Sequence, residues 1–354
     1  MAKVFKGRGA LNNPVPRFGA QATQAIDDGW YREELADSIA TEVRPEAARS
    51  IISRNDSPDI PFEQSINPYR GCEHGCIYCY ARPSHAYMDL SPGIDFETRL
   101  FYKADAARLL RAELAKPGYL CKPIMLGANT DPYQPLEQRL KVTRSLLEVL
   151  LATRHPVSII TKGTLVLRDL ELLRELATLN LVRVYVSCTT LDVELKRKLE
   201  PRTASPQARL RVIAALAAAG VPVGVMTAPI IPAINDAELE SLLETAAQAG
   251  ATRAGFVLLR LPYEVKLLFR DWLAEHYPER AAHVMSLVQQ ARGGQDNDGR
   301  FGTRMRGTGP WAVLLRARFE LACRRLNLNQ ERALELATQH FRAPRVDGQL
   351  EFAL

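Results

Sequence analysis

Short apolar runs alternate with longer segments of helical periodicity from residue 65 to about residue 261. The short runs predict six β-strands, at 65–70, 123–128, 157–161, 182–188, 222–227 and 255–259. The longer segments predict helices between them, at 104–115, 140–152, 165–179, 206–219 and 237–249. Such alternation is typical of an α/β fold with a parallel sheet. Six units fit a partial (β/α)6 TIM-type barrel better than a closed eight-stranded one.

The two ends of the chain have different patterns. Residues 1–26 hold four basic residues and no acidic one, which predicts an extended N-terminal arm, and amphipathic pieces such as 31–40 predict short helices before a linker that ends near residue 62. After residue 261 the pattern predicts helices at 264–276, 279–290, 311–326 and 329–341. We therefore expect an N-terminal arm with short helices over 1–62, the barrel over 63–261 and a C-terminal α-helical extension over 262–354.

Composition places few limits on function. With 47% hydrophobic and 24% charged residues, the 354-residue chain is of the ordinary globular kind and not of the low-complexity or disordered kind. No apolar run is long enough to span a membrane, and the N-terminus lacks the apolar core of a signal peptide, so we expect a cytoplasmic protein. The net charge of +6 permits an anionic partner without requiring one.

Three of the six cysteines, Cys72, Cys76 and Cys79, lie within one eight-residue stretch that contains Gly75. In a reducing compartment such clustering indicates a metal site rather than disulfides. The C-x3-C-x2-C spacing offers three soft ligands with no fourth cysteine nearby, which suits a four-iron cluster with one open iron. Two alternatives are disfavoured but open: a structural zinc site completed by His74 or His85, and buried thiols without a metal.

This motif, GCEHGCIYCY after the first predicted strand, resembles the radical SAM superfamily over about residues 66–260. It is most similar to the branch that contains spore photoproduct lyase. With the RGA near the N-terminus and the long C-terminal tail, the chain resembles a group of uncharacterised bacterial radical SAM proteins related to that lyase. The resemblance implies a [4Fe-4S] cluster that cleaves S-adenosylmethionine, giving a 5′-deoxyadenosyl radical that abstracts hydrogen from a substrate. It also implies an electron donor such as flavodoxin or ferredoxin.

The resemblance also implies roles for particular residues. Cys72, Cys76 and Cys79 would bind three irons, with Tyr78 and Tyr80 beside them at the catalytic centre. The groups implied to hold S-adenosylmethionine are Tyr78, Asn129, Thr130, Asp131, Lys162, Ser187 and Arg202. From the residues alone, Asp131 is as readily a turn residue, Lys162 a solvated surface lysine and Arg202 an ion-pair partner of Glu200. Where the lyase has a hydrogen-donor cysteine, this chain has Ala128 and Asn129, which puts the lyase's own repair relay in doubt.

Residues 291–311, named here the Arg/Gly segment, are too rich in glycine for a helix. Over residues 291–325, eight arginines against three acidic residues give a net charge of +5. Arginine with Phe301 and Trp311 is compatible with nucleic-acid binding, with a solvated face or with an active-site lid. The substrate is thus unassigned, with a nucleic acid as the first candidate. The alternative function is a structural or redox-sensing iron–sulfur or zinc protein without turnover.

Overall fold

The computed structural model describes residues 7–18, 39–330 and 335–344, and a seven-stranded sheet of order β10-β9-β8-β7-β6-β3-β2 forms its centre. Its strands are β2 (Ile52–Arg54), β3 (Gln64–Ile66), β6 (Ile124–Leu126), β7 (Val157–Thr161), β8 (Val182–Ser187), β9 (Val223–Ile230) and β10 (Arg253–Leu258). The strands from β3 to β10 run parallel, and β2 pairs antiparallel with β3. Among the described residues the edge strands β2 and β10 do not pair with each other. The six parallel strands therefore form the predicted partial barrel.

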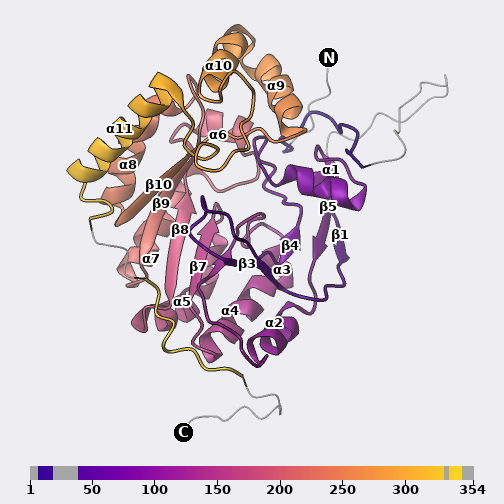
Figure 1. Cartoon of the computed structure of the whole chain (residues 1–354), viewed down its shortest axis with the longest axis vertical. Helices are drawn as coiled ribbons and strands as arrows, with labels where there is room; N and C mark the ends of the chain where they lie inside the picture. The colour runs from indigo at the N-terminus through magenta and orange to yellow at the C-terminus, as the bar shows by residue number, and fades with distance from the viewer. Residues whose placement is uncertain (1–6, 19–38, 331–334, 345–354) are drawn as a thin grey trace, which may run out of the picture.

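Helices cover the outer face of this sheet (Figure 1). They are α1 (Asp95–Thr98), α2 (Ala106–Leu114), α3 (Glu137–Leu140), α4 (Val142–Ala152), α5 (Leu170–Thr178), α6 (Val193–Leu199), α7 (Pro206–Ala218), α8 (Leu239–Gln248), α9 (Val265–His276), α10 (Pro278–Gln290) and α11 (Gly309–Arg325), with 3-10 helices η1 (Arg82–Met88), η2 (Leu165–Asp169) and η3 (Asp236–Glu238). Val182, Val184 and Val186 alternate along β8 and are fully buried in the main hydrophobic core, to which α4, α5, α7 and α8 also contribute. Because parallel strands end at the same edge, the loops after them meet there.

The predicted first strand, 65–70, is in fact two strands in different sheets. Strand β3 ends at Ile66, and β4 (Tyr69–Arg70) joins a second sheet of order β1-β5-β4, with β1 (Glu42–Pro45) and β5 (Arg99–Tyr102). Pro68 lies between β3 and β4 and has no N–H to donate to a ladder, which accounts for the break. The cysteine-containing loop therefore starts from β4.

The N-terminal region differs from the predicted arm with short helices. Within residues 39–62 the structure forms strands β1 and β2, because Val43 and Ile52 pack against the core as strand residues do. Most of the amphipathic piece at 31–40 lies outside the described residues. Residues 7–11, named here the N-terminal segment, are not a free arm, since Arg8, Ala10 and Leu11 are buried.

The C-terminal region confirms three of the four predicted helices, as α9, α10 and α11. Helix α11 lies beside α8 (Figure 1). The fourth prediction, a helix at 329–341, is wrong over the part that the structure describes, because residues 335–344 form no helix; residues 331–334 lie outside the described residues. Phe341 packs against Tyr119 and His155, with ring centroids 5.5 and 5.3 Å away, and this docking overrides local helix propensity. No helix of the described residues is long and apolar enough to cross a membrane.

Candidate active site

The cysteine loop, residues 71–80, follows β4 near the carboxyl edge of the parallel strands. Cys72 and Cys76 are buried, Cys79 is half-buried, and none of them is in a disulfide. Two backbone hydrogen bonds tighten the loop: Gly75 N donates to Cys72 O (3.3 Å), and Cys79 N donates to Cys76 O (3.2 Å). The loop thus presents three thiols from consecutive tight turns.

Glycine and a buried ion pair set the shape of the cysteine loop. Gly71 and Gly75 have φ of 74° and 67°, and a Cβ at Gly75 would lie 2.7 Å from Glu97 Oε2. Arg82, with no exposed surface, donates to Cys76 O (2.9 Å), Gly75 O (3.1 Å) and Glu97 Oε1 (2.5 Å). A planar guanidinium between two loop carbonyls and a carboxylate fixes their spacing. The backbone of the cysteine loop is therefore held by Arg82 and Glu97.

The donor set of the cysteine loop fits a [4Fe-4S] cluster. Burial raises the pKa of all three thiols, that of Cys76 to about 12, so cationic iron is needed to hold them as thiolates. In the zinc interpretation, each histidine has one ring nitrogen facing another group: His85 Nε2 lies 2.9 Å from Arg99 O, and His74 Nδ1 lies 3.3 Å from Asp131 Oδ2. In the described part of the chain, no group of three or more Cys, His, Asp or Glu residues is arranged to hold a single ion.

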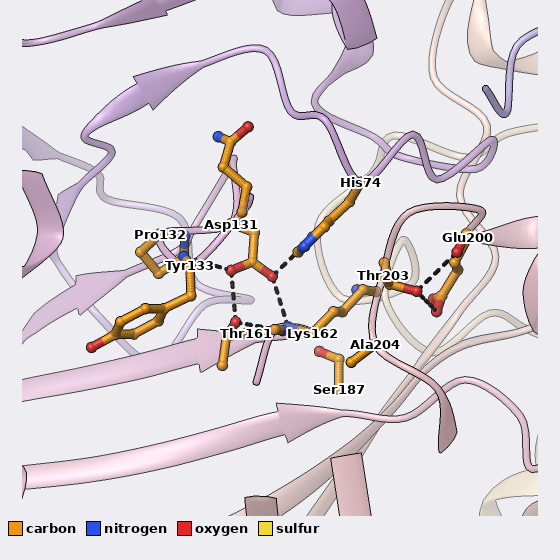
Figure 2. A network of polar contacts seen from close by, with 12 residues as sticks. His74, Asp131, Pro132, Tyr133, Thr161, Lys162, Ser187, Glu200, Thr203 and Ala204 are labelled. Atoms are coloured by element: carbon orange, nitrogen blue, oxygen red, sulfur yellow. Dashed lines mark hydrogen bonds and ion pairs between the residues drawn. The ribbon is translucent and has the colours of Figure 1, made fainter. Parts of the chain in front are cut away.

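Asp131 is the centre of a polar group at the ends of β6 and β7 (Figure 2). Its carboxylate accepts hydrogen bonds from Thr161 Oγ1 (2.7 Å), the backbone N–H of Lys162 (2.7 Å) and that of Tyr133 (2.9 Å), and it faces His74. Burial alone would raise its pKa, but His74 and these donors lower the pKa of Asp131 to about 2. Asp131 is thus an anion that fixes the cysteine loop to the next two strand ends.

Lys162 extends from this group toward Glu200 and Thr203, with Ser187 beside it (Figure 2). Its Nζ lies 6.0 Å from the centroid of the Tyr78 ring and makes no hydrogen bond to any residue that the structure describes. Burial opposes its charge, but the neighbouring Cys76 and Glu200 raise the pKa of Lys162. Lys162 is therefore a half-buried ammonium beside the thiols with its donors available.

Glu200 is the site residue that the sequence prediction missed. It is fully buried after α6 and accepts hydrogen bonds from Tyr78 Oη, Thr189 Oγ1 (2.7 Å) and Arg209 Nη2. Burial would raise its pKa, but Arg209 and Lys162 lower the pKa of Glu200 to about 2. The predicted alternative partner of Glu200, Arg202, instead pairs with Glu73 at 3.2 Å.

The remaining predicted residues lie around this centre. Ser187 is buried at the end of β8, and its hydroxyl makes no hydrogen bond to another described residue. The Thr130 hydroxyl is already engaged, donating to Tyr69 O at 2.7 Å, whereas Asn129 is exposed. Tyr80, 46% exposed, donates its hydroxyl to Ala128 O. The structure thus gathers Tyr78, Asp131, Lys162 and Ser187 near the thiols, and it places Asn129 and Tyr80 at the open rim.

Other residues that hold the loop carried no local signal in the sequence. Arg82, Glu97 and Arg209 act through partners that lie up to about 90 positions away, such as Arg8 on the backbone O of Glu97 at 2.9 Å. Arg82 lies three residues beyond Cys79, and this proximity to the motif is the one signal that indicates a role for it.

Comparisons with known proteins show which family and which folds this chain is similar to. A family model described as the radical SAM superfamily matches residues 66–246. Uncharacterised proteins of Mycobacterium tuberculosis and Mycobacterium bovis are 42% identical over 233 residues, which is 65% of this chain and 68% of theirs. An uncharacterised protein of Methanocaldococcus jannaschii is 28% identical over 214 residues, 60% of this chain and 76% of its own.

Among solved structures, spore photoproduct lyase complexed with dinucleoside spore photoproduct is similar, with a TM-score of 0.59 and 17% identity over 80% of this chain and 79% of the lyase. A mutant of that lyase gives a TM-score of 0.59 and 17% identity, covering 87% of this chain and 86% of its own. At this identity the likeness establishes a shared fold.

Proposed function

The chain belongs to the radical SAM superfamily and is therefore an enzyme that uses a [4Fe-4S] cluster and S-adenosylmethionine; from this premise we propose that Cys72, Cys76 and Cys79 bind three irons of the cluster. The observation that carries the proposal is the gathering of three thiols, two buried and one half-buried, with the free Lys162 ammonium and the Ser187 hydroxyl at one sheet edge. When both groups are bound, reductive cleavage of S-adenosylmethionine supplies a 5′-deoxyadenosyl radical that abstracts hydrogen from a substrate.

We assign the binding of S-adenosylmethionine to Lys162 and Ser187, with Asn129 at the rim. A compact ammonium suits the methionine carboxylate, and a free hydroxyl can donate or accept a hydrogen bond. Asp131 is a positioning residue, because its carboxylate already holds the backbone N–H of Lys162 and faces His74. We assign Thr130 and Arg202 to holding the loops, since their side chains are engaged with Tyr69 and Glu73.

Buried polar groups beside the thiols favour turnover over the alternative of a structural or redox-sensing cluster. A structural cluster needs only burial and ligands for its irons. An ammonium without a hydrogen-bond partner, such as that of Lys162, costs free energy to bury unless a ligand accepts its hydrogen bonds. Lys162 keeps its hydrogen-bond donors available next to Cys76, and Ser187 does the same from β8. These two side chains are what a bound S-adenosylmethionine would use.

For the substrate we propose a nucleic acid, and for the electron donor a flavodoxin or ferredoxin. A solved structure of the same fold holds a dinucleoside spore photoproduct, and this chain carries a net charge of +6. The Arg/Gly segment supports this less than its composition suggests. Arg300 and Arg304 pair with Asp298 and Asp59, and Arg292 donates to backbone carbonyls. The same +5 stretch leaves Arg306 and Arg324 exposed and without a partner among the described residues.

Anaerobic reconstitution tests the proposed cofactor ligands. The wild type should bind about four irons per chain, and Cys72→Ala should abolish the cluster while Cys323→Ala, at a buried cysteine outside the loop, leaves it intact. Lys162→Ala should weaken S-adenosylmethionine binding about tenfold or more without loss of iron, as for one charge-assisted contact. Lys122→Ala, at an exposed lysine paired with Glu63, is the matched control.

Reduction with dithionite should then yield 5′-deoxyadenosine and methionine. A full iron content in a variant that lacks Cys72, Cys76 and Cys79 would contradict the ligand assignment. An electron resonance spectrum of the reduced cluster that S-adenosylmethionine leaves unchanged would contradict the assignment of the open iron.

A further inference from the structure

Arg260 lies directly after β10, on the strand-end side where the cysteine loop sits. Its neighbours Leu259 and Leu261 are buried, at 2% and 0% exposure, whereas Arg260 is half-buried. The backbone here is held: Arg292 donates to Leu259 O at 2.6 Å, and Leu261 N donates to Asn297 Oδ1 at 3.1 Å. The direction of the Arg260 side chain is therefore fixed by the fold.

The guanidinium of Arg260 lies against Tyr80, 5.5 Å from its ring centroid, which places it beside the last cysteine of the cluster motif. Its Nη1 contacts Met305 Sδ at 3.5 Å, and its buried Nε has no hydrogen-bond partner. A guanidinium has five N–H donors, and a thioether is a weak acceptor. The described residues thus leave nearly all of the donors of a half-buried arginine unused.

Among the residues that the structure describes, no carboxylate forms an ion pair with Arg260. Asp59, whose negative charge acts on Arg260, accepts from Arg304 Nε at 2.8 Å and from the backbone N–H of Gly302 at 2.7 Å. Burial and the positive charge of Arg304 lower the pKa of Arg260, which agrees with an excess of positive charge at this position. The Asp59 carboxylate is thus engaged by Arg304, and the charge of Arg260 is left without an ion-pair partner among the described residues.

We propose that Arg260 binds a backbone phosphate of the nucleic-acid substrate at the rim beside Tyr80. The planar fork of arginine matches a phosphate group in two-point geometry. The half-exposed Tyr80 ring offers an adjacent surface on which a base can stack. This inference rests on the proposed function, because it assigns a residue to the same site and narrows its substrate to one with phosphates.

Binding to short probes tests this inference without requiring turnover. The reconstituted enzyme is titrated with fluorescent single-stranded oligothymidylate and oligouridylate over a range of salt concentrations, and with an oligoglutamate peptide of equal charge. Arg260→Met should weaken nucleic-acid binding about tenfold and reduce the log–log salt slope by about 0.7, as one lost phosphate contact does. Arg260→Lys keeps the charge but not the planar fork, so its nucleic-acid affinity should lie between those of the wild type and Arg260→Met. Arg108→Met, at an exposed arginine of α2 paired with Asp105, should match the wild type.

The outcomes separate this inference from the proposed function. Equal nucleic-acid affinity in wild type and Arg260→Met would overturn the role of Arg260 and leave the substrate class standing. Tighter binding of oligoglutamate, or no binding of either nucleic acid by the wild type, would overturn both. Weaker binding of S-adenosylmethionine by Arg260→Met would place the residue at the cofactor and also overturn the inference. The inference is supported if Arg260→Met loses nucleic-acid affinity and still forms 5′-deoxyadenosine at the wild-type rate in the absence of substrate.

Discussion

At the scale of single residues, Glu200 joins three parts of the site. It accepts from Tyr78 of the cysteine loop, from Thr189 after β8 and from Arg209 of α7. Arg209 also donates to Ser187 O at 2.9 Å, so the same pair supports a residue that we assign to S-adenosylmethionine. Both charges are buried, and breaking such a pair leaves an uncompensated charge in the interior.

Glu200→Gln should therefore lower the free energy of unfolding by about 3 to 5 kcal/mol, the cost of removing one partner of a buried pair. Urea denaturation of the anaerobic protein measures it. The double variant Glu200→Gln, Arg209→Met should lose less than the sum of the two single variants, because it leaves no unpaired charge. Glu194→Gln, at an exposed residue paired with Arg197, should change stability by less than about 0.5 kcal/mol. Additive losses would show that the pair is not coupled.

What the sequence revealed about the site depends on how local each contact is. The cysteine spacing and the strand-end positions of Asp131, Lys162 and Ser187 are local patterns, and the structure brings these residues together. Glu200 was missed because its partners Tyr78 and Arg209 lie 122 and 9 positions away and no periodicity links them. Arg202 pairs with Glu73 and not with the expected Glu200 for the same reason: Glu73 lies 129 positions away in the sequence.

At the scale of elements, the N-terminal segment packs directly on the cysteine loop. The backbone N–H groups of Gly9 and Ala10 each donate to the Glu97 carboxylate at 2.9 Å. Arg82 links the same carboxylate to the carbonyls of the loop. A Cβ at Gly9 would lie 1.8 Å from Gly75 O, so only glycine allows this approach. The N-terminal segment thus packs against Gly75 and Glu97, which shape the cysteine loop.

Gly9→Ala should displace the N-terminal segment and expose the cluster loop, because a backbone oxygen cannot move aside cheaply. We expect a loss of about 1 to 3 kcal/mol in unfolding free energy, as for overpacking, and several-fold faster bleaching of the reconstituted cluster in air. Visible absorbance follows the bleaching. Gly299→Ala, where a Cβ meets nothing within 4 Å, is the control. Equal bleaching rates in the two variants would contradict a covering role.

Element prediction succeeded where the pattern alone decides structure and failed where a distant partner does. The strand at 157–161 was predicted to the residue, since its alternation is buried on one side. The extended C-terminal stretch at 335–344 has the composition of a helix, but Ala337 N bonds to Asn180 O at 2.9 Å and Arg342 N to Thr153 O at 2.8 Å. Those contacts depend on the finished sheet, which no local pattern contains.

At the scale of the whole molecule, the Arg/Gly segment connects the two edges of the open barrel. On the β10 side, Leu258 N donates to Met305 O at 3.0 Å. On the β2 side, Arg304 Nε donates to Asp59 at 2.8 Å, and Arg304 also contacts Ser57. The side of a partial barrel that strands leave open is thus bridged by one loop. Of the three interpretations of this segment, the contacts favour the lid, with Arg304 and Asp59 as its closing pair.

Opening this bridge should increase wasteful cleavage of S-adenosylmethionine, because an open site admits solvent and stray hydrogen donors. We expect Asp59→Asn and Arg304→Met each to raise 5′-deoxyadenosine formation without substrate several-fold. The double variant should be no worse than either single one, since the two residues close the same contact. Arg300→Met removes an ion pair with Asp298 inside the segment and does not cross the opening, so it should behave as the wild type does. Product counts per reduced cluster measure all four variants. A rise in Arg300→Met equal to that in Arg304→Met would mean that the segment works through its own folding and not through its contact with Asp59.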